Sequence, residues 1–148
     1  MVHRAELAFG TSPVMVAAWP GVGSVGLLAV DYLRTKLHAK QFAQVDMRPF
    51  FVPTSVPVKE GRMMAPRMPR SGFHERHSPD MIIFESTAQV SGRDALMLLR
   101  GVVGAAKSYG VSRIITVGAF PRPVSHRNRP LLYYGCSDET LIAELGSI

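Results

Sequence analysis

Residues 13–26 decide the fold, and they read Pro-Val-Met-Val-Ala-Ala-Trp-Pro-Gly-Val-Gly-Ser-Val-Gly. The run from residue 14 to residue 19 is continuously apolar, which is typical of a strand that is covered on both faces in a parallel sheet. Three glycines follow it with the spacing G-x-G-x-x-G, and apolar residues then recur at helical spacing. The stretch therefore predicts a buried strand, a tight turn and a helix in succession.

Two interpretations of this turn stay open. In a dinucleotide-binding fold, such glycines let the backbone approach a pyrophosphate at a helix N-terminus. The residues that would cradle the anion are Gly21, Gly23, Ser24 and Gly26. Pro20, however, removes a backbone N–H where a phosphate loop needs a donor. That favours a turn built for close packing, in which Trp19 and Pro20 are structural residues.

Two acidic residues could contact a sugar in the nucleotide interpretation. Asp46 lies 20 residues after Gly26 (46 − 26), the separation at which that fold places its ribose-binding acid. Asp46 could equally be a solvent-facing residue of a strand, because Val45 and Met47 flank it. Glu85 follows a buried strand at its carboxyl end, where α/β proteins place their sites. The competing role for Glu85 is to cap a neighbouring loop.

Strands and helices are expected to alternate along the rest of the chain. We expect strands at residues 42–52, 56–65, 80–86, 113–120 and 131–136, the first two paired as a hairpin with a bend at Glu60 and Gly61. Residues 66–79 hold three prolines and are expected to be a loop. Helices are expected at residues 24–38, at 91–109 and from 137 to Gly146.

The ends and the interior of the second helix carry further signals. Ser91 and Asp94 resemble a capping box at its start, and Gly110 is a favoured residue just past its end. Gly101 and Gly104 lie inside it and lower its helix propensity. We expect these two glycines to allow close packing.

The order of elements predicts a three-layer α/β/α sandwich with a largely parallel central sheet. At 148 residues the chain is expected to form a single domain, in which residues 1–12 are a leader and 13–148 the folded part. No strand follows the last predicted helix. We therefore expect the sheet to be incomplete at the C-terminus.

The formal net charge of +6 is concentrated in two segments rich in proline, 57–77 and 122–129, each with a net charge of +3. Clustered arginines can neutralise nucleic-acid phosphates. Phe73 is the only aromatic residue within either segment, however, and no known nucleic-acid module is present. We expect a solvated or partner-facing basic rim rather than a nucleic-acid site.

Several other classes of protein and site are not favoured. No apolar stretch approaches the roughly 20 residues of a membrane-spanning helix, and a single cysteine, Cys136, fits a reducing cytoplasm. His74 and His77 lack the spacing of a zinc-binding helix, so we expect no metal site. Ser24 lacks the glycine two residues before it that a nucleophile elbow needs, so we expect no catalytic serine.

Four segments of the chain belong together. They are Trp-Pro-Gly-x-Gly-x-x-Gly at 19–26, Ile-Ile-Phe-Glu-Ser-Thr-Ala-Gln at 82–89, Tyr-Gly-Val-Ser-Arg-Ile-Ile-Thr-Val-Gly-Ala-Phe at 109–120, and Tyr-Gly-Cys-Ser-Asp-Glu at 134–139. With these segments the chain resembles the proteasome assembly chaperone family from residue 13 to its end. The first segment is the most specific, and it accounts for Pro20.

The resemblance implies a fold like that of nucleoside phosphorylases and hydrolases, used as a binding scaffold that often self-associates. Relatives help to assemble or regulate proteasome rings, and some prokaryotic relatives carry an ATP-grasp label without catalytic residues that map onto this chain. The implied function is non-enzymatic protein binding without a cofactor. The chain ends Gly-Ser-Ile, not in the hydrophobic–Tyr–any-residue tail of proteasome-binding relatives, so its partner need not be a proteasome. The alternative is an enzyme that binds a nucleotide or phosphorylated ligand at residues 21–26.

Overall fold

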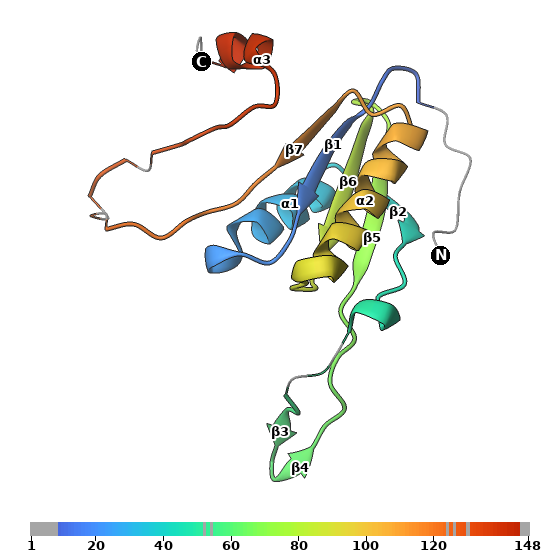
Figure 1. Ribbon diagram of the computed structural model, residues 1–148, viewed down its shortest axis with the longest axis vertical. Helices are drawn as coiled ribbons and strands as arrows, with labels where there is room; N and C mark the ends of the chain where they lie inside the picture. Colours follow the sequence, from blue (N-terminus) through green and yellow to red (C-terminus); the bar gives the residue numbers. More distant parts are fainter. Residues whose placement is uncertain are drawn as a thin grey trace.

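A five-stranded sheet lies between two helices in the computed structural model, which describes residues 9–51, 53, 55–123, 125, 127–129 and 131–145 (Figure 1). The strand order is β2-β5-β6-β1-β7. These strands are β1 (Val14–Ala18), β2 (Lys40–Gln44), β5 (Ser71–Arg76), β6 (Met81–Ser86) and β7 (Arg113–Thr116). The helices on its two faces are α1 (Val25–Lys36), preceded by a 3₁₀ turn at Val22–Ser24, and α2 (Gly92–Ser108).

Three short elements lie outside this sandwich, in addition to a 3₁₀ turn at Arg48–Phe50. Strands β3 (Val58–Lys59) and β4 (Arg62–Met63) pair only with each other among the described strands. Helix α3 (Glu139–Leu145) follows a long extended segment after β7.

The strand directions agree with the predicted α/β/α sandwich. Strand β1 pairs in parallel with β6 and with β7, whereas β5 is antiparallel to both β6 and β2. Strand β2 therefore runs in the same direction as β6, β1 and β7. Strands β6, β1 and β7 are parallel neighbours at the centre and one edge of the sheet. The fold class is confirmed.

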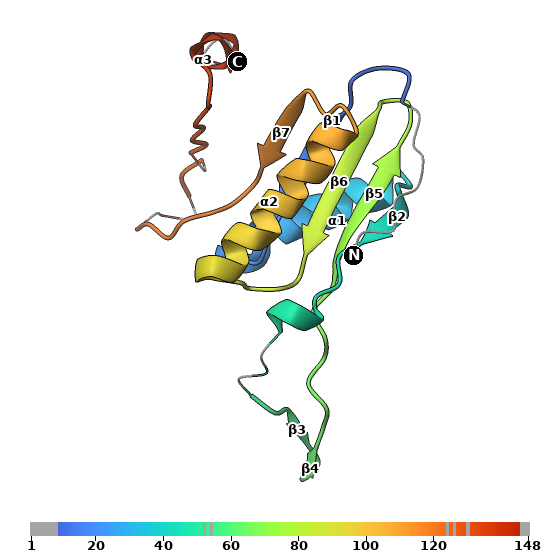
Figure 2. The same cartoon turned by 45° about the vertical axis from the view of Figure 1, so that its right-hand side comes forward.

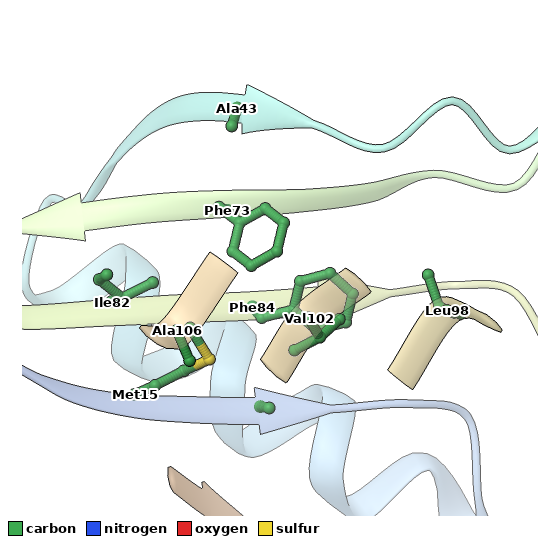
Figure 3. Packing of buried hydrophobic residues seen from close by; sticks show 9 residues of the cluster. Met15, Ala43, Phe73, Ile82, Phe84, Leu98, Val102 and Ala106 are labelled. Atoms are coloured by element: carbon green, nitrogen blue, oxygen red, sulfur yellow. The ribbon is translucent and has the colours of Figure 1, made fainter. Parts of the chain in front are cut away.

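The larger hydrophobic core lies between the sheet and α2 (Figure 3). Successive strand residues point to opposite faces, so one member of each neighbouring pair enters this core. From the sheet come Met15, Ala17, Ala43, Phe73, Ile82 and Phe84. Leu98, Val102 and Ala106 are spaced four apart on α2 and meet them as one apolar stripe.

The opposite face of the sheet has a smaller core under α1. Val16 and Ala18 of β1 and Ile83 of β6 pack there against Val30 of α1. Strands β5 and β2 add no buried apolar residue to this second core among the residues described. The part of this face over β5 and β2 is therefore left for polar side chains.

The prediction that residues 66–79 form a loop is wrong, because Ser71–Arg76 is β5, a strand with a neighbour on each side. Its inward residue Phe73 is the only large apolar side chain in it. The other face presents Gly72, His74 and Arg76. This strand therefore lacks the continuous apolar run that marks a strand buried on both faces, and its place is set by backbone pairing.

The predicted hairpin between residues 42–52 and 56–65 is also wrong. Strand β2 ends at Gln44 and pairs with β5, and the second segment folds back on itself as the β3–β4 hairpin. Glu60 and Gly61 form its bend, as expected, with φ of 52° and 75°. The hairpin projects away from the sandwich in both views of the molecule (Figures 1 and 2).

Two expectations for the C-terminal third need correction. Strand β7 ends at Thr116 rather than at residue 120, and it is exposed at the edge of the sheet, with Ile114 and Ile115 at 40% and 44% exposure. Residues 131–136 form no strand, and Leu132 is 93% exposed. Helix α3 begins at Glu139, two residues after the predicted start at residue 137, while Gly146, its predicted end, is outside the described residues.

The helix signals were partly right. Gly110 ends α2 with φ of 67°, as predicted. Ser91 and Ser24 precede α2 and α1, but neither side chain makes a capping hydrogen bond. Gly101 and Gly104 are exposed, and a Cβ on either would meet nothing within 4 Å, so they serve no close packing in this chain. None of the described helices combines the length and hydropathy needed to cross a membrane.

Candidate functional site

The glycine turn after β1 uses its own backbone groups. The N–H of Ser24 donates to the carbonyl of Gly21 over 3.0 Å, and the N–H of Val25 donates to the carbonyl of Val22. Gly23 and Ser24 have φ of 61° and 53°, the left-handed region that this tight reversal requires. Two of the amides at the start of α1 are thus engaged inside the turn.

Gly26 is the position where the turn has no room for a side chain. It is buried, and a Cβ there would lie 2.3 Å from the carbonyl oxygen of Val117. That distance is below any van der Waals contact, so only glycine fits without a backbone shift. Gly26 therefore brings the start of α1 against the chain that follows β7.

Trp19 anchors the same turn on the other face of the sheet. Its ring is half-buried, with its centroid 5.3 Å from that of Phe84, and it packs against the α2 core. With Val90 and Leu99 it also lines a small cavity of about 160 Å³. Pro20 follows Trp19 directly, and the chain leaves the sheet at this point.

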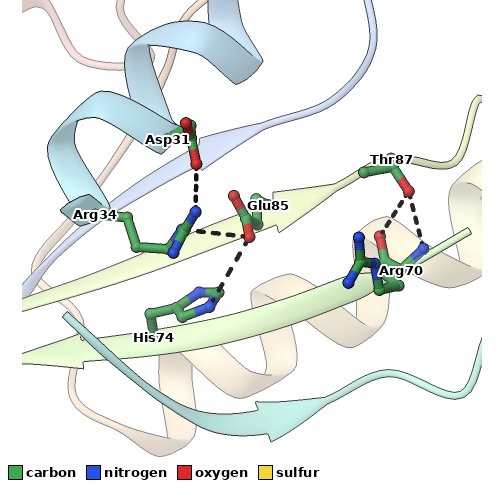
Figure 4. Close-up of polar contacts among 6 residues, drawn as sticks. All are labelled: Asp31, Arg34, Arg70, His74, Glu85 and Thr87. Atoms are coloured by element: carbon green, nitrogen blue, oxygen red, sulfur yellow. Dashed lines mark hydrogen bonds and ion pairs between the residues drawn. The ribbon is translucent and has the colours of Figure 1, made fainter.

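A cleft of about 590 Å³ lies between α1 and the polar part of the sheet (Figure 4). Helix α1 contributes Leu27, Leu28, Asp31 and Arg34 to one wall. His74 of β5 and Glu85 of β6 form part of the floor. Because β5 and β6 are antiparallel neighbours, the period of two residues places these two side chains on the same face.

The charged side chains of the cleft form one connected network. Oε1 of Glu85 lies 3.5 Å from Nε of Arg34 and 3.9 Å from Nε2 of His74. Arg34 also pairs with Asp31 one turn earlier on α1. Burial lowers the pKa of His74, and the nearby Glu85 carboxylate opposes this only in part. The imidazole is therefore expected to be neutral at neutral pH.

Two nitrogen atoms of the network are buried. They are Nε of Arg34 and Nδ1 of His74. His74 is only 6% exposed. Buried polar groups in folded proteins nearly always have a partner: Nε of Arg34 faces Oε1 of Glu85, and the imidazole of His74 is hydrogen-bonded to the backbone of Ile83, so the network is held together by protein groups.

The structure does not bring the predicted ligand residues together. Glu85 lines the cleft, whereas Gly21, Gly23, Ser24 and Gly26 do not line it. Asp46 lies after the end of β2 rather than within a strand, and its carboxylate holds Nε and Nη2 of Arg48 at 2.9 and 2.7 Å. These hydrogen bonds lower the pKa of Asp46 to about 2.

Sequence reasoning missed Arg34 and His74 as partners of Glu85. His74 falls in the segment, residues 66–79, that is predicted to be a loop. The alternation of residues 71–76, with Phe73 between polar neighbours, was the signal that could have placed His74 on a strand face.

The histidine cluster does not converge on one point. His74 faces the cleft, while His77 lies in the turn after β5, 3.5 Å from Glu75 and 3.8 Å from Asp80. In the part of the chain that the structure describes, no three His, Cys, Asp or Glu side chains are placed to hold a metal ion.

Exposed apolar side chains gather on α2 and β7, which follow each other along the chain. On α2 they are Leu96, Met97, Leu99 and Val103, between 41% and 58% exposed. On β7 they are Ile114 and Ile115, which point to opposite faces of the sheet edge.

Comparison with known proteins relates most of the chain to one family. The PAC2 family model matches residues 15–148. Comparison with curated protein sequences finds no match.

Solved structures share the fold. A PAC2 family protein from Streptomyces avermitilis has a TM-score of 0.69 and 19% identity, over 90% of this chain and 61% of that one. PbaB of Pyrococcus furiosus, described as an archaeal proteasome activator, has a TM-score of 0.66 and 24% identity, over 85% and 53%. A proteasome-assembly chaperone homologue from Mycobacterium tuberculosis has a TM-score of 0.58 and 16% identity, over 72% and 49%.

The match covers about half to three-fifths of each of these structures. The glycine turn, the strand that carries Glu85 and the two helices all lie within the residues that the family model covers. Since the PAC2 family model matches most of the length of this chain, the chain belongs to the PAC2 family.

Proposed function

We propose that this protein is a non-enzymatic, assembly-chaperone-like protein of the cytoplasm, which acts by binding other proteins and by self-association. Membership of the PAC2 family supports the chaperone-like role. So do structural relatives described as a proteasome activator and as homologues of proteasome-assembly chaperones. A proteasome-like complex is the partner that these relatives suggest. The single cysteine fits a reducing compartment.

The exposed apolar surface of α2 carries this proposal. Leu96, Leu99 and Val103 are spaced i, i+3 and i+7, so they lie on one side of the helix, next to the stripe that enters the core. Exposed apolar side chains gathered in this way are typical of protein–protein contact sites. They extend the buried face of α2 outward, where another protein could cover them.

The edge of the sheet adds a second contact surface. Strand β7 pairs only with β1 among the described strands, so its outer backbone N–H and C=O groups face away from the sheet. Ile114 and Ile115 are exposed on its two faces. An edge of this kind is a template for pairing with another chain, which supports self-association.

The enzymatic alternative has less support. A phosphate cradle needs free amides at the start of the helix, but those of Ser24 and Val25 donate within the turn. Gly26 is accounted for by its approach to Val117. The carboxylate of Asp46 is already engaged by the side chain of Arg48 rather than left free to bind a ribose.

Light scattering coupled to size-exclusion chromatography tests self-association. We expect the wild-type chain to be larger than a monomer at high micromolar concentration. Ile115→Lys on β7 and Leu96→Lys on α2 should each weaken the association at least about tenfold, since a charge would be buried in an apolar contact. Thr35→Lys on the exposed side of α1 is the matched control and should leave it unchanged. A wild-type monomer under these conditions would contradict the proposal.

Affinity capture from the native lysate tests the partner. The wild-type chain should retain subunits of a proteasome-like complex, and Leu96→Lys should retain fewer of them than Thr35→Lys. Equal capture by the two variants would remove α2 from the proposed contact surface.

A further inference from the structure

We propose that the arm formed by residues 56–70, together with a pocket at its base, binds an acidic segment of a partner protein that also carries large apolar side chains. The arm contains strands β3 and β4 and projects away from the sandwich (Figures 1 and 2). The inference names the chemistry of one partner, and so it rests on the proposed protein-binding function. It concerns a surface other than α2 and β7, and it does not require self-association.

The arm carries an excess of positive charge. Its basic residues are Lys59, Arg62, Arg67 and Arg70, all of them exposed, and Glu60 is its only acidic residue. In the part of the chain that the structure describes, no carboxylate forms an ion pair with any of these four basic side chains. Their charge is therefore left for the acidic groups of a partner, which an arginine cluster recognises well.

The hairpin at the tip of the arm places two of these cations opposite each other. In the β3–β4 ladder, Lys59 is paired with Arg62, and Val58 is paired with Met63. Paired residues lie on the same face of a ladder, and like charges in such a pair are destabilising. A carboxylate between Lys59 and Arg62 would remove this repulsion. One face of the hairpin therefore favours an anionic group.

The other face of the hairpin is apolar. Val58 and Met63 share it, and Met63 is 81% exposed. Further exposed apolar side chains of the arm are Val56, Met64 and Met68. Methionine is common at binding surfaces, because its flexible side chain adapts to the shape of a partner. The phosphate backbone of a nucleic acid offers nothing apolar to these side chains, so they favour a protein as the partner.

A pocket of about 410 Å³ lies at the base of the arm. Arg67 and Arg70 line it, and no acidic residue of the described chain does. Its volume lies within the range of about 300–1,000 Å³ that is usual for binding sites. It can hold a large apolar side chain whose acidic neighbours pair with the two arginines. The apolar part of its lining comes from Phe50, Phe51, Met68, Pro69 and Ala88.

Backbone hydrogen bonds fix the base of the arm to the sheet. The N–H of Thr87 donates to the carbonyl oxygen of Arg70 over 2.8 Å, and the N–H of Arg70 donates to Oγ1 of Thr87 over 2.9 Å (Figure 4). These bonds leave the guanidinium of Arg70 available. The N–H of Met64 donates to the carbonyl oxygen of Pro57 and extends the hairpin. The arm is therefore preformed, which lowers the entropy cost of binding.

Fluorescence anisotropy of four labelled probes with the full chain tests the proposal. The main probe is the peptide Asp-Glu-Asp-Leu-Phe-Glu-Asp-Glu. Two further peptides replace Leu-Phe by Ser-Ser or every acid by its amide, and the fourth probe is an oligouridylate of matching charge. We expect saturable binding of the main peptide and at least about tenfold weaker binding of the other three.

Three outcomes overturn the proposal. They are no binding of the main peptide, equal binding of either altered peptide, and binding of the oligouridylate as tight as that of the main peptide, which would indicate a nucleic-acid site. The oligomeric state is measured separately, so any of these outcomes leaves the proposed self-association standing.

Charge reversal on the arm connects binding to this surface. Arg67→Glu should weaken binding of the main peptide at least about tenfold, and the fold should stay intact because Arg67 is exposed and belongs to neither core. The matched control is Arg93→Glu, the same change of charge at an exposed arginine in the first turn of α2, and it should leave the affinity unchanged. Equal affinities of the two variants overturn the proposal.

A second pair of variants tests the apolar part of the contact. Met68→Gln should weaken binding of the main peptide more than that of the Ser-Ser peptide, since only the main peptide offers apolar side chains to the pocket. Met97→Gln is the matched control, an exposed methionine on α2. Equal loss of binding to both peptides in Met68→Gln would contradict an apolar anchor in this pocket.

Discussion

The two faces of the sheet are made by neighbouring residues and yet differ in chemistry. On β5, Phe73 enters the core under α2, and the next residue, His74, lies in the cleft beside α1. On β6, Phe84 and Glu85 are divided in the same way. The rings of Phe73 and Phe84 are 4.8 Å apart at their centroids, behind the contact between His74 and Glu85 on the other face.

The two faces of the sheet therefore have different roles, one in stability and the other in holding a network of polar groups. Burial of apolar surface under α2 is favourable without any need for partners. Partial burial of Glu85 and His74 costs free energy unless hydrogen bonds compensate it. We infer that the α2 face holds the fold together, and that the α1 face depends on it to keep polar groups in place.

Removal of an aromatic ring from the α2 face should have the largest effect. Phe84→Ala should lower the free energy of unfolding by about 3–5 kcal/mol, since it leaves a cavity next to Phe73 and Trp19. Urea denaturation measures this. The control is Phe120→Ala, a phenylalanine that is 61% exposed, and it should stay within about 0.5 kcal/mol of wild type. Equal losses in the two variants would contradict the role of the α2 face.

A steric substitution in the turn at the start of α1 should have an intermediate effect on stability. Gly26→Ala should cost about 1–3 kcal/mol, because its Cβ would lie 2.3 Å from the carbonyl oxygen of Val117. Gly21→Ala is the matched control, since a Cβ there meets nothing within 4 Å and the backbone is extended. Thermal unfolding of both variants measures this difference in stability. A Gly26→Ala protein as stable as Gly21→Ala would show that α1 does not approach the chain so closely.

The polar face should respond to pH. Burial lowers the pKa of His74 below its ordinary 6.5, so the unfolded chain binds this proton more readily than the folded one. Stability is therefore lost as pH falls through about 6.5 toward the lowered folded value, and it is retained above 6.5. The urea midpoint should fall from about pH 7 to about pH 5, and His74→Gln should reduce this fall.

The same substitution at exposed His38 is the control for that pH dependence. Glu85 and Arg34 are the charged groups nearest to His74, and they act in opposite directions on its pKa. If His74→Gln and His38→Gln show the same midpoint change with pH, His74 does not carry the effect.

The smallest effect is expected outside both faces, at the Asp46–Arg48 pair. Arg48→Ala should raise the pKa of Asp46 from about 2 toward its ordinary 3.8, because the side-chain hydrogen bonds that favour the carboxylate are lost while the one from the backbone N–H of residue 48 remains. A titration of the Asp46 carboxyl followed by nuclear magnetic resonance measures the shift. The urea midpoint at neutral pH should change little, since surface ion pairs contribute little to stability. A pKa that stays near 2 would point to another cause than Arg48.

Apolar periodicity predicted some strands and missed another for the same reason. Strands β1 and β6 are central and are covered by helices on both faces, so their continuous apolar runs stand out. Strand β5 has Phe73 on its covered face and His74 on the cleft, so its pattern resembles a polar loop. The proline-rich segment before it reinforced that impression. Glu85 was found because it lies at the end of an apolar strand. His74 was missed because its own strand, β5, was not predicted.

By itself the sequence determined the α/β class, the parallel central strands, the two covering helices and the family, because these follow from local apolar runs, turn glycines and a specific motif. Only the tertiary structure decided which strands lie side by side and hence which polar residues meet. Arg34, His74 and Glu85 come from three different elements, and pairing of β5 with both β2 and β6 sets their separation. Contacts between distant segments depend on register and on helix placement, which no local pattern records. The close approach of Gly26 to Val117 has the same origin.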